Sequence, residues 1–443
     1  MDSAPAVTLL VIIADDLTGA ADSGAPFARL GFSTVVVLDP FGELPGSGSE
    51  AEGAASGPAV VVLNTDSRYL RPTEAADAVT HGLRLLRTLG PRVVYKKVDS
   101  LFRGNVGSEI AAAMDAIGAS ACLLAPAFPE QGRTTEKGRC IVYGTPLPSA
   151  EIAGVLDSTA PGAFDVRLLE PGDFEGLEPG GSSGTSSVTS SVTSSVTSSG
   201  PRSGSRRLLL ADAWKQEHLE GLASAVLDGP TTRRASGGPI LLAGSGGFAA
   251  AIATEMARNA VGTPGFSAPE RPPGMPASIG TRGVLVVSGS RSSESARQLE
   301  VLRAGAGEPV PVVTPTDPPE AAGSGVRDRV REALAADGIA AVATDPGPTI
   351  AGASNRVAAI AGEVLTSGAR PRILFVGGET AMAALRRVDA RRITLLGEIE
   401  PGIAYGLVPE SRFGVLQIAT KAGAFGDPET LLRLVERLRS HDL

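Results

Sequence analysis

The chain alternates between short apolar runs and longer alanine-rich stretches, and this alternation constrains the fold more than any other feature. Apolar residues recur with helical spacing at positions 19–30, 72–89 and 106–117. An apolar run, a helical stretch and a second apolar run form a βαβ unit, which requires a parallel sheet covered by helices. We therefore expect an α/β core in the first part of the chain. Its predicted strands are 9–13, 33–38, 59–63, 92–96, 121–124, 207–210 and 240–243.

The same rhythm restarts near residue 284, where helical stretches at 293–304 and 324–336 separate further apolar runs. The restart predicts an α/β fold with two domains, each built on a mostly parallel sheet flanked by helices. In parallel sheets of this kind, ligands bind beyond the carboxyl ends of the strands. The predicted strands of the second domain are 284–287, 310–313, 340–343, 373–376 and 415–418.

Two stretches that are poor in large apolar residues divide the chain. With 443 residues, the chain is too long for one hydrophobic core. Pro and Gly are frequent from residue 262 onward, so we assign 1–260 to the first domain, 261–283 to a linker and 284–443 to the second domain. Residues 180–206 consist mainly of Ser, Thr, Gly and Val, and we expect a disordered insertion there.

Charge and composition argue against several classes of protein. A net charge of −8 and a pI near 5.2 disfavour a nucleic-acid surface, which needs clustered Lys and Arg. The apolar run at 7–13 has no basic flank and ends at Asp15 and Asp16, so we expect no membrane segment. Three His residues supply few metal ligands. We expect Cys122 and Cys140 to be reduced thiols in a cytoplasmic protein.

A glycine pair follows the apolar run that ends at residue 376. Gly377 and Gly378 lead through Glu379 and Thr380 into a helical stretch. Backbone N–H groups at a helix N-terminus point toward an anion, and glycine lets phosphate oxygens come close. The pattern therefore favours nucleotide binding. Two further turns of similar character occur at 288–292 and 420–423.

A second glycine motif supports a rival interpretation. Residues 244–249 fit a loose Gly-x-Gly-x-x-Ala pattern after a strand, which raises the alternative of an NAD-dependent enzyme. The motif stands at the end of the first domain instead of in its first βα unit, and no acidic residue follows at the expected spacing. A tight packing turn between strand and helix is the interpretation that we favour. The chain contains no P-loop motif.

Two adjacent acids end the first predicted strand. Asp15 and Asp16 stand directly before a helical stretch, together with Thr18 and Asp22. One acid is enough to cap a helix, so capping alone does not account for the pair. Paired acids at a strand end are where hydroxyl recognition and proton removal are commonly built. We therefore favour a functional site over a cap.

Further polar residues follow two later predicted strands, 59–63 and 92–96. Arg68 follows one of them, and Lys97, Asp99, Arg103 and Asn105 follow the other. Because these strand ends meet at one edge of a sheet, the side chains suit a small polyhydroxylated acid. Arginine offers paired donors to a carboxylate, and aspartate accepts from sugar hydroxyls. The alternative is a solvated cluster of ion pairs, which would contribute little.

Two other features stay open on the sequence alone. Lys421 is equally well explained as a phosphate contact and as a solvated surface charge. Residues 132–135 lie in a Pro/Gly-rich segment without obvious secondary structure, and they suit either a lid over the substrate or a contact between domains.

In its motifs the chain resembles the four-carbon acid sugar kinases. The resemblance extends over both domains and rests on motifs that occur in the same order. It departs from the family's pattern at Leu101 and Phe102, where the family commonly has Thr-Leu, and at Ala422, where it has Ser. The matching motifs are 14–20, 65–68, 96–105, 126–135, 144–147, 288–292, 377–381, 398–402 and 420–423.

The resemblance implies a division of labour between the domains. The first domain would bind the acid sugar, the second would bind ATP, and the active site would lie in the cleft between them. ATP would phosphorylate the terminal hydroxyl of threonate, erythronate or a 3-oxo-tetronate. The implied acid-sugar contacts lie on N-terminal strand ends, where we select Arg68, Lys97, Arg103 and Asn105. The implied ATP contacts are Ser290, Gly377, Gly378, Glu379, Thr380 and Gly423.

The mechanism that we expect aligns the acceptor hydroxyl with the γ-phosphate and neutralises charge with Mg²⁺. Asp16 is the candidate for orienting or deprotonating that hydroxyl, with Asp15 and Asp99 as rivals. The sequence assigns no metal ligands. It also leaves open a homo-oligomer and the alternative of a non-catalytic, nucleotide-responsive protein.

Overall fold

The structure is a computed structural model, and it describes residues 9–39, 44, 58–174, 205–227, 239–261, 283–305, 312–313, 323–335, 338–344, 353–366 and 370–440. The chain forms two compact units. Unit 1 consists of Met1–Asp15 and Glu43–Ala268, and unit 2 consists of Asp16–Gly42 and Pro269–Leu443. The segment Asp16–Gly42 therefore packs with unit 2, whereas the sequence pattern assigned it to the first domain.

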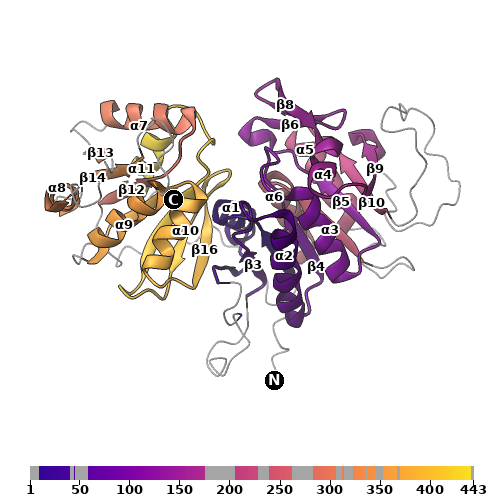
Figure 1. Ribbon diagram of the computed structural model, residues 1–443, viewed down its shortest axis with the longest axis horizontal. Coiled ribbons are helices and arrows are strands. Elements are labelled where there is room, and N and C mark those ends of the chain that lie inside the picture. The colour runs from indigo at the N-terminus through magenta and orange to yellow at the C-terminus, as the bar shows by residue number, and fades with distance from the viewer. Residues whose placement is uncertain are drawn as a thin grey trace, which may run out of the picture. The chain divides into compact units, whose positions relative to one another are not determined.

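Unit 1 is built on a parallel sheet whose strands lie in the order β3, β1, β4, β11, β5, β10, β9. Figure 1 labels β3, β4, β5, β9 and β10 of this sheet. Every residue of β1, β3 and β5 is buried, as expected for parallel strands with both faces covered. The strands are β1 (Leu10–Ala14), β3 (Val60–Asn64), β4 (Val93–Lys97), β5 (Ala121–Ala125), β9 (Phe164–Leu169), β10 (Arg206–Ala211) and β11 (Ile240–Gly244).

The helices of unit 1 pack against this sheet and against each other. Helix α2 packs on α3, and α5 packs on α6. The left-handed residue Gly118 (φ 66°) ends α3, where the absence of a side chain permits this conformation. The helices are α2 (Pro72–Leu86), α3 (Val106–Ile117), α4 (Ile152–Thr159), α5 (Gln216–Leu227) and α6 (Gly246–Ala260).

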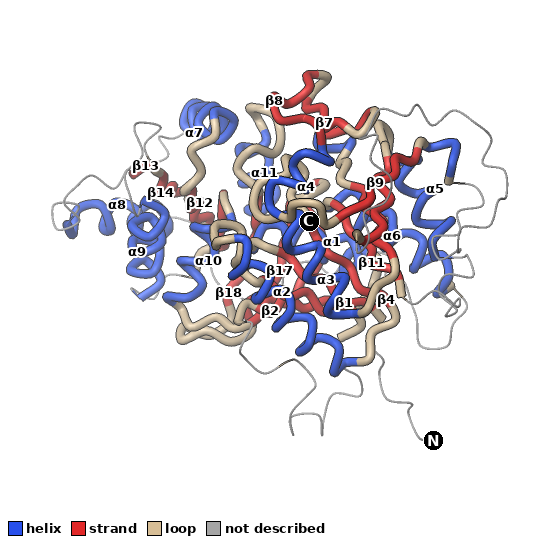
Figure 2. Tube along the Cα trace, turned by 45° about the vertical axis from the view of Figure 1, so that its right-hand side comes forward, coloured by secondary structure: helices blue, strands red, loops and turns tan. Residues whose placement is uncertain are grey.

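A small antiparallel sheet follows β5, and the sequence did not predict it. Its strands β6 (Arg133–Glu136), β7 (Arg139–Val142) and β8 (Thr145–Glu151) lie in that order. Figure 2 shows β7 and β8 as a hairpin apart from the parallel strands β1, β4 and β11. The segment 132–135, for which the sequence left open a lid or a contact between domains, thus includes the first residues of a paired strand, which begins directly after the left-handed residue Gly132 (φ 68°).

Unit 2 contains a mixed sheet in the order β13, β14, β12, β15, β18, β17, β16, β2. The first five strands are parallel, and β17, β16 and β2 continue the sheet in antiparallel pairs. The strands are β2 (Thr34–Val37), β12 (Val284–Ser288), β13 (Val312–Val313), β14 (Ile339–Ala343), β15 (Arg372–Val376), β16 (Arg392–Glu400), β17 (Ile403–Val408) and β18 (Leu416–Lys421).

Helix α1 explains why an N-terminal segment belongs to unit 2. It packs on β16 and β17 and contacts α10, and β2 directly after it pairs with β16 (Figure 1). We did not predict β16 or β17; β16 pairs with β2, which is far away in the sequence, and β17 pairs with β16 and β18. The helices of unit 2 are α1 (Leu17–Arg29), α7 (Ser293–Gly305), α8 (Gly323–Ala335), α9 (Ala353–Thr366), α10 (Gly378–Arg387) and α11 (Thr430–Ser440).

The α/β fold with mostly parallel sheets is confirmed. The linker expected at 261–283 and the insertion expected at 180–206 lie almost entirely outside the described residues. Cys122 and Cys140 are both buried free thiols, in agreement with the sequence prediction. Within the described part of the chain, no helix combines the length and the apolarity needed to cross a membrane.

Candidate active site

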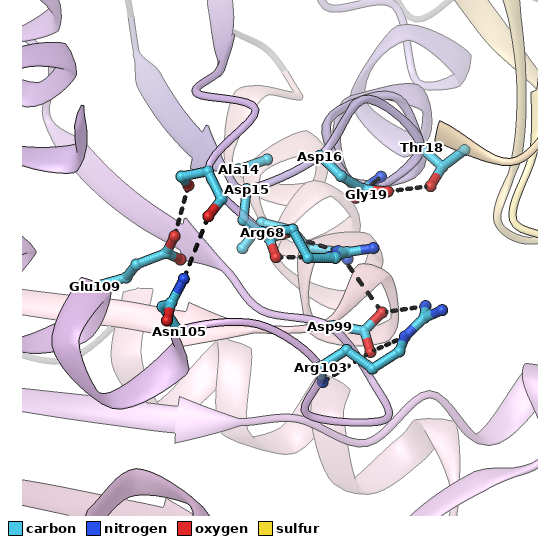
Figure 3. Close-up of polar contacts among 12 residues, drawn as sticks. Ala14, Asp15, Asp16, Thr18, Gly19, Arg68, Asp99, Arg103, Asn105 and Glu109 are labelled. Atoms are coloured by element: carbon cyan, nitrogen blue, oxygen red, sulfur yellow. Dashed lines mark hydrogen bonds and ion pairs between the residues drawn. The ribbon is translucent and has the colours of Figure 1, made fainter. Parts of the chain in front are cut away.

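Charged side chains from the ends of β1, β3 and β4 meet in unit 1, and we call Asp15, Arg68, Asp99 and Arg103 the charged cluster. Arg68 donates to both carboxylate oxygens of Asp15, at 2.7 and 2.8 Å. Arg103 donates in the same two-point manner to Asp99, at 2.8 and 2.7 Å. Arg68 also lies 3.7 Å from Asp99, so it stands between the two acids (Figure 3). The structure therefore brings together residues that the sequence placed after three different strands.

The cluster keeps its acids ionised although they are buried. Burial opposes the charge of Asp15, but the charge and hydrogen bonds of Arg68, helped by Lys96, outweigh it and lower the pKa of that carboxyl. At Asp99 burial is likewise outweighed, by Arg68, Arg103 and Lys97, so its pKa lies far below the usual range. Both groups are carboxylates at neutral pH and act as acceptors.

The backbone around the cluster is tightly turned. Asp99 accepts hydrogen bonds from the N–H groups of Leu101 and Arg103, at 3.2 and 3.1 Å, which closes the loop after β4. Phe102 in this loop has a φ of 57°, an uncommon conformation for a bulky residue. Gly104 has a φ of 88°, and a Cβ there would lie 3.1 Å from Asp15. The departure from the family pattern at Leu101 and Phe102 thus falls in a loop whose shape Asp99 fixes.

Two further predicted substrate contacts are buried beside the cluster. Lys97 is 3% exposed, and its charge helps to lower the pKa of Asp99. Asn105 donates its side-chain amide to the carbonyls of Ser67 and Leu70, at 3.3 and 2.9 Å. Asn105 thus holds the turn after Arg68, and its predicted contact with a substrate stays a prediction.

Sequence reasoning missed a second layer behind the cluster. Lys96, fully buried, forms a 2.8 Å ion pair with Glu109, which also accepts a 2.5 Å hydrogen bond from Ser67. The Ser67 hydroxyl lies 2.7 Å from that of Thr65. The available signal was charge inside apolar elements, because Lys96 stands in a buried strand and Glu109 in the first turn of α3.

Glycines from different strand ends gather within unit 2, and we call Gly289, Gly377, Gly378 and Gly423 the glycine cradle. Gly377 has a φ of 102° and caps α10 without a side chain. A Cβ on Gly289 would come within 1.7 Å of the Thr380 hydroxyl, which only glycine permits. The turns after β12, β15 and β18 therefore approach each other as the sequence predicted.

Hydroxyl groups line the glycine cradle. A Cβ on Gly423 would lie 2.1 Å from the Ser290 hydroxyl, so these two predicted residues touch. Ser295 donates to the carbonyl of Gly423 at 2.8 Å. Ser288, 1% exposed at the end of β12, has a buried hydroxyl oxygen without a hydrogen-bond partner among the described residues. Such a group suits a site that binds a polar ligand.

Lys421 and Glu379 differ in their environment. Lys421 is fully buried and donates to the carbonyls of Ala422 and Gly423, at 3.0 and 3.1 Å. It is therefore no solvated surface charge, and it holds the turn that carries Gly423. Glu379, predicted to contact ATP, is exposed in the first turn of α10.

Asp16 lies against the glycine cradle within unit 2. It caps α1 by accepting from the N–H of Gly19 at 2.8 Å, and it accepts from the Thr18 hydroxyl at 2.7 Å (Figure 3). A Cβ on Gly378 would come within 2.5 Å of its carboxylate. The capping role is thus real, and the same carboxylate also faces the cradle. The consecutive residues Asp15 and Asp16 therefore differ in their surroundings: Asp15 belongs to the charged cluster, and Asp16 lies beside the glycine cradle.

The glycine motif at 244–249 is a packing turn. A Cβ on Gly244 would lie 2.3 Å from the carbonyl oxygen of Ala125, and one on Gly247 would lie 2.8 Å from that of Ala127. Ser245 caps α6 and donates to Ala127. These glycines are needed for contact between neighbouring segments, which leaves the NAD interpretation without support from this loop.

Comparison with known proteins matches two different domain families to the two halves of the chain. Residues 10–169 match a sugar-binding N-terminal domain family, and residues 285–431 match a nucleotide-binding C-terminal domain family. The fold resembles that of a Haemophilus influenzae protein assigned to a domain of unknown function. Its TM-score is 0.60 at 20% identity, over 96% of this chain and 99% of the other.

Curated relatives extend over nearly the whole chain. A D-threonate kinase of Cupriavidus necator is 31% identical over 438 residues, which is 95% of this chain and 96% of the relative. A 3-oxo-tetronate kinase of the same organism is 26% identical over 452 residues, with 98% of both chains covered. The motifs, the two-part site and these relatives agree, and the chain belongs to the four-carbon acid sugar kinase family.

Proposed function

We propose that this protein transfers the γ-phosphoryl group of ATP to the terminal hydroxyl of a four-carbon acid sugar. The observation that carries the proposal is the pair of consecutive acids, because Asp15 lies in the charged cluster and Asp16 lies against the glycine cradle. A kinase needs a site for the acceptor and a site for the phosphates. We assign Asp15 to the acceptor site and Asp16 to the phosphate site.

The charged cluster supports an acidic, hydroxylated acceptor. Arg68, Lys97 and Arg103 gather around Asp99, and half of the Arg103 side chain is exposed. A guanidinium group matches a carboxylate with two parallel hydrogen bonds. The ionised carboxylates of Asp15 and Asp99 can accept hydrogen bonds from sugar hydroxyl groups. We propose Arg68, Lys97, Arg103 and Asn105 as the acceptor-binding residues.

The glycine cradle supports binding of the ATP phosphates. Gly377 and Gly378 open the N-terminus of α10, where backbone N–H groups and the helix dipole attract anions. The unpaired hydroxyl oxygen of Ser288 is a further polar group at this strand end. Bound ATP would supply the phosphoryl group. We propose nucleotide contacts at Ser290, Gly377, Gly378, Glu379, Thr380 and Gly423.

Among the three candidate acids, Asp16 suits proton removal best. Asp15 and Asp99 are each held by an arginine in a two-point pair that lowers the pKa, which makes them weak bases. Asp16 accepts from the Gly19 N–H and the Thr18 hydroxyl, and its carboxylate lies beside Gly378, where the phosphates would bind. We therefore propose that Asp16 orients or deprotonates the acceptor hydroxyl.

Mg²⁺ belongs to the proposal together with ATP. Among the described residues, no group of three or more His, Cys, Asp or Glu forms a metal site. Mg²⁺ in nucleotide enzymes is commonly held by phosphates, water and one or two carboxylates, and Asp16 is a carboxylate beside the cradle. The ion would neutralise charge on the phosphates.

The test is ADP release from ATP and Mg²⁺ with D-threonate, D-erythronate and a 3-oxo-tetronate, and with the neutral polyol threitol as the control. We expect release with one or two of the acids and none with threitol. D-threonate is the first choice, since the relative with 31% identity is a D-threonate kinase. A non-catalytic, nucleotide-responsive protein would instead show ATP-dependent thermal stabilisation without ADP release from any acid.

A further inference from the structure

Four buried residues behind the charged cluster form a connected polar group, and we call Thr65, Ser67, Lys96 and Glu109 the buried quartet. None of them is more than 6% exposed. Glu109 is its centre, because one carboxylate oxygen pairs with Lys96 at 2.8 Å and the other accepts from Ser67 at 2.5 Å. Thr65 joins the quartet through the hydroxyl of Ser67, at 2.7 Å.

The quartet is bonded to each strand end that carries the charged cluster. Thr65 donates to the carbonyl of Ala14 at 2.9 Å, next to Asp15. Lys96 donates to the carbonyl of Lys97 at 2.7 Å, at the start of the loop that contains Asp99. These two hydrogen bonds connect the quartet to the backbone shortly before Asp15 and shortly before Asp99.

The turn that carries Arg68 is held most firmly. The Ser67 side chain donates to Glu109, and the Ser67 N–H donates to the carbonyl of Asp15 at 2.9 Å. The Ser67 carbonyl accepts from Asn105, which immediately precedes α3. These bonds fix the position of Ser67. Because Arg68 is the next residue, they also fix where its side chain leaves the backbone.

Electrostatics argue that the quartet has a role besides packing. Burial raises the pKa of Glu109, and the charge of Asp15 adds to this rise, while Lys96 and Ser67 oppose it. A buried ion pair loses its hydration, and an apolar pair of similar volume is often equally stable. An ion pair at this place is therefore better explained by the geometry that it imposes than by stability.

We propose that Glu109 is a positioning residue for the acid-sugar site, acting through Lys96 and Ser67 on the strand ends that hold Asp15, Arg68 and Asp99. Glu109 touches neither substrate in this role. It sets where the Arg68 guanidinium and its two partner acids lie. This inference rests on the proposed function of the charged cluster, and the nucleotide contacts in unit 2 are outside its reach.

The experiment uses graded variants of the full-length protein. Ser67→Ala removes the bond to Glu109 and the contact with the Thr65 hydroxyl. Glu109→Gln keeps the size and an acceptor but removes the charge, and the double variant Lys96→Met, Glu109→Leu replaces the pair with apolar groups. Glu255→Gln is the matched control, since Glu255 is a buried acid that pairs with Arg258 at 3.1 Å in α6 of the same unit. Melting temperatures verify that each variant folds.

We expect Glu109→Gln and the double variant to raise KM for the acid sugar by about tenfold or more, while KM for ATP changes less than about twofold. Ser67→Ala should have a smaller effect in the same direction, and Glu255→Gln should have none. A folded double variant with wild-type KM for the acid would overturn the proposal. If the double variant does not fold, Glu109→Gln decides by the same criterion.

Failure of the proposed function is separable from failure of this inference. If the wild-type protein releases no ADP with any acid, the kinase proposal fails, and crystal structures of the wild type and of Glu109→Gln then test the positioning role. We expect the two-point pair between Arg68 and Asp15 to be displaced in the variant. An unchanged pair would overturn the inference, whatever the substrate is.

Discussion

The two parts of the site use opposite chemistry. The charged cluster of unit 1 consists of side chains, with Arg68 and Arg103 each bound to an acid at two points. The glycine cradle of unit 2 consists of backbone, and an added Cβ at Gly289, Gly378 or Gly423 would collide with a neighbour. In the proposed function, the charged cluster would discriminate among ligands by their acidic and hydroxyl groups. The glycine cradle would bind the phosphates of any nucleotide, because backbone N–H groups do not recognise the base.

The strongest test of this comparison is Asp16→Asn, because Asp16 lies against the cradle but serves the acceptor in the proposed mechanism. We expect turnover to fall by about 10²- to 10⁴-fold. The affinity for ATP should change little, since the amide still caps α1. Steady-state kinetics with a nucleotide-binding assay would measure both quantities. Asp77→Asn, on the exposed face of α2, is the control. Equal turnover in Asp16→Asn and the wild type would remove Asp16 from the reaction.

The second test adds one methyl group to the cradle. In Gly378→Ala the new Cβ would lie 2.5 Å from Asp16 and 3.2 Å from Thr18, so the turn must shift. Overpacking costs about 1–3 kcal/mol, and we expect the dissociation constant of ATP to rise by roughly tenfold. The acid-sugar KM should stay near the wild-type value. Gly362→Ala in α9, where the new Cβ meets only ordinary contacts, is the matched control. Unchanged ATP affinity in Gly378→Ala would contradict the cradle.

The third test probes the other half of the comparison. Arg103→Met removes a half-exposed guanidinium from Asp99 and leaves the apolar stem. We expect KM for the acid sugar to rise by about tenfold, and KM for ATP to stay unchanged. Arg71→Met is the control, because Arg71 pairs with Glu74 on the exposed start of α2. A variant that loses ATP affinity instead would show that the cluster serves the nucleotide.

The smallest expected effect concerns the turn between β6 and β7 in unit 1. Asp212 accepts from the Gly138 N–H at 3.1 Å, and burial raises the pKa of its carboxyl to about 6. Because the pKa of Asp212 is higher in the folded than in the unfolded protein, protonated Asp212 stabilises the fold. This stabilisation is complete below about pH 4 and is lost as the pH rises through about 6. Asp212→Asn keeps an acceptor without this loss. We therefore expect its melting temperature to exceed that of the wild type at pH 7.5 by more than at pH 4. A pH-independent difference would exclude this titration.

The sequence predicted the parallel strands and the place of the charged cluster because both depend on local signals. Asp15, Arg68 and Asp99 each follow an apolar run, and parallel strands bring such positions to one edge. Glu109 was missed, because an acid in the first turn of a helix is usually a surface residue. The antiparallel strands β16 and β17 were missed for a different reason. β16 pairs with β2, which is more than 350 residues away in the chain, and no local pattern records such a separation. β17 joins the sheet through β16 and β18.

The role of Asp16 was predictable only in part. Its position before a helix predicted a cap, and the structure contains that cap. Its contact with Gly378 depends on the packing of α1 in unit 2, and no local sequence pattern predicts that packing. The assignment of Arg68, Lys97, Arg103 and Asn105 to the substrate stays a prediction. Their grouping in the structure supports it.

The association of α1 and β2 with unit 2 determines the order in which the molecule can be completed during synthesis. Both elements leave the ribosome early, and β16 is made roughly tens of seconds later at ordinary rates of translation. Until then, Leu17 and Phe27, which are fully buried in the finished protein, lack their packing partners. Unit 2 thus cannot fold as its own residues emerge. A gene fragment that starts at residue 284 would not complete it, since strand β2, which pairs with β16, would be missing.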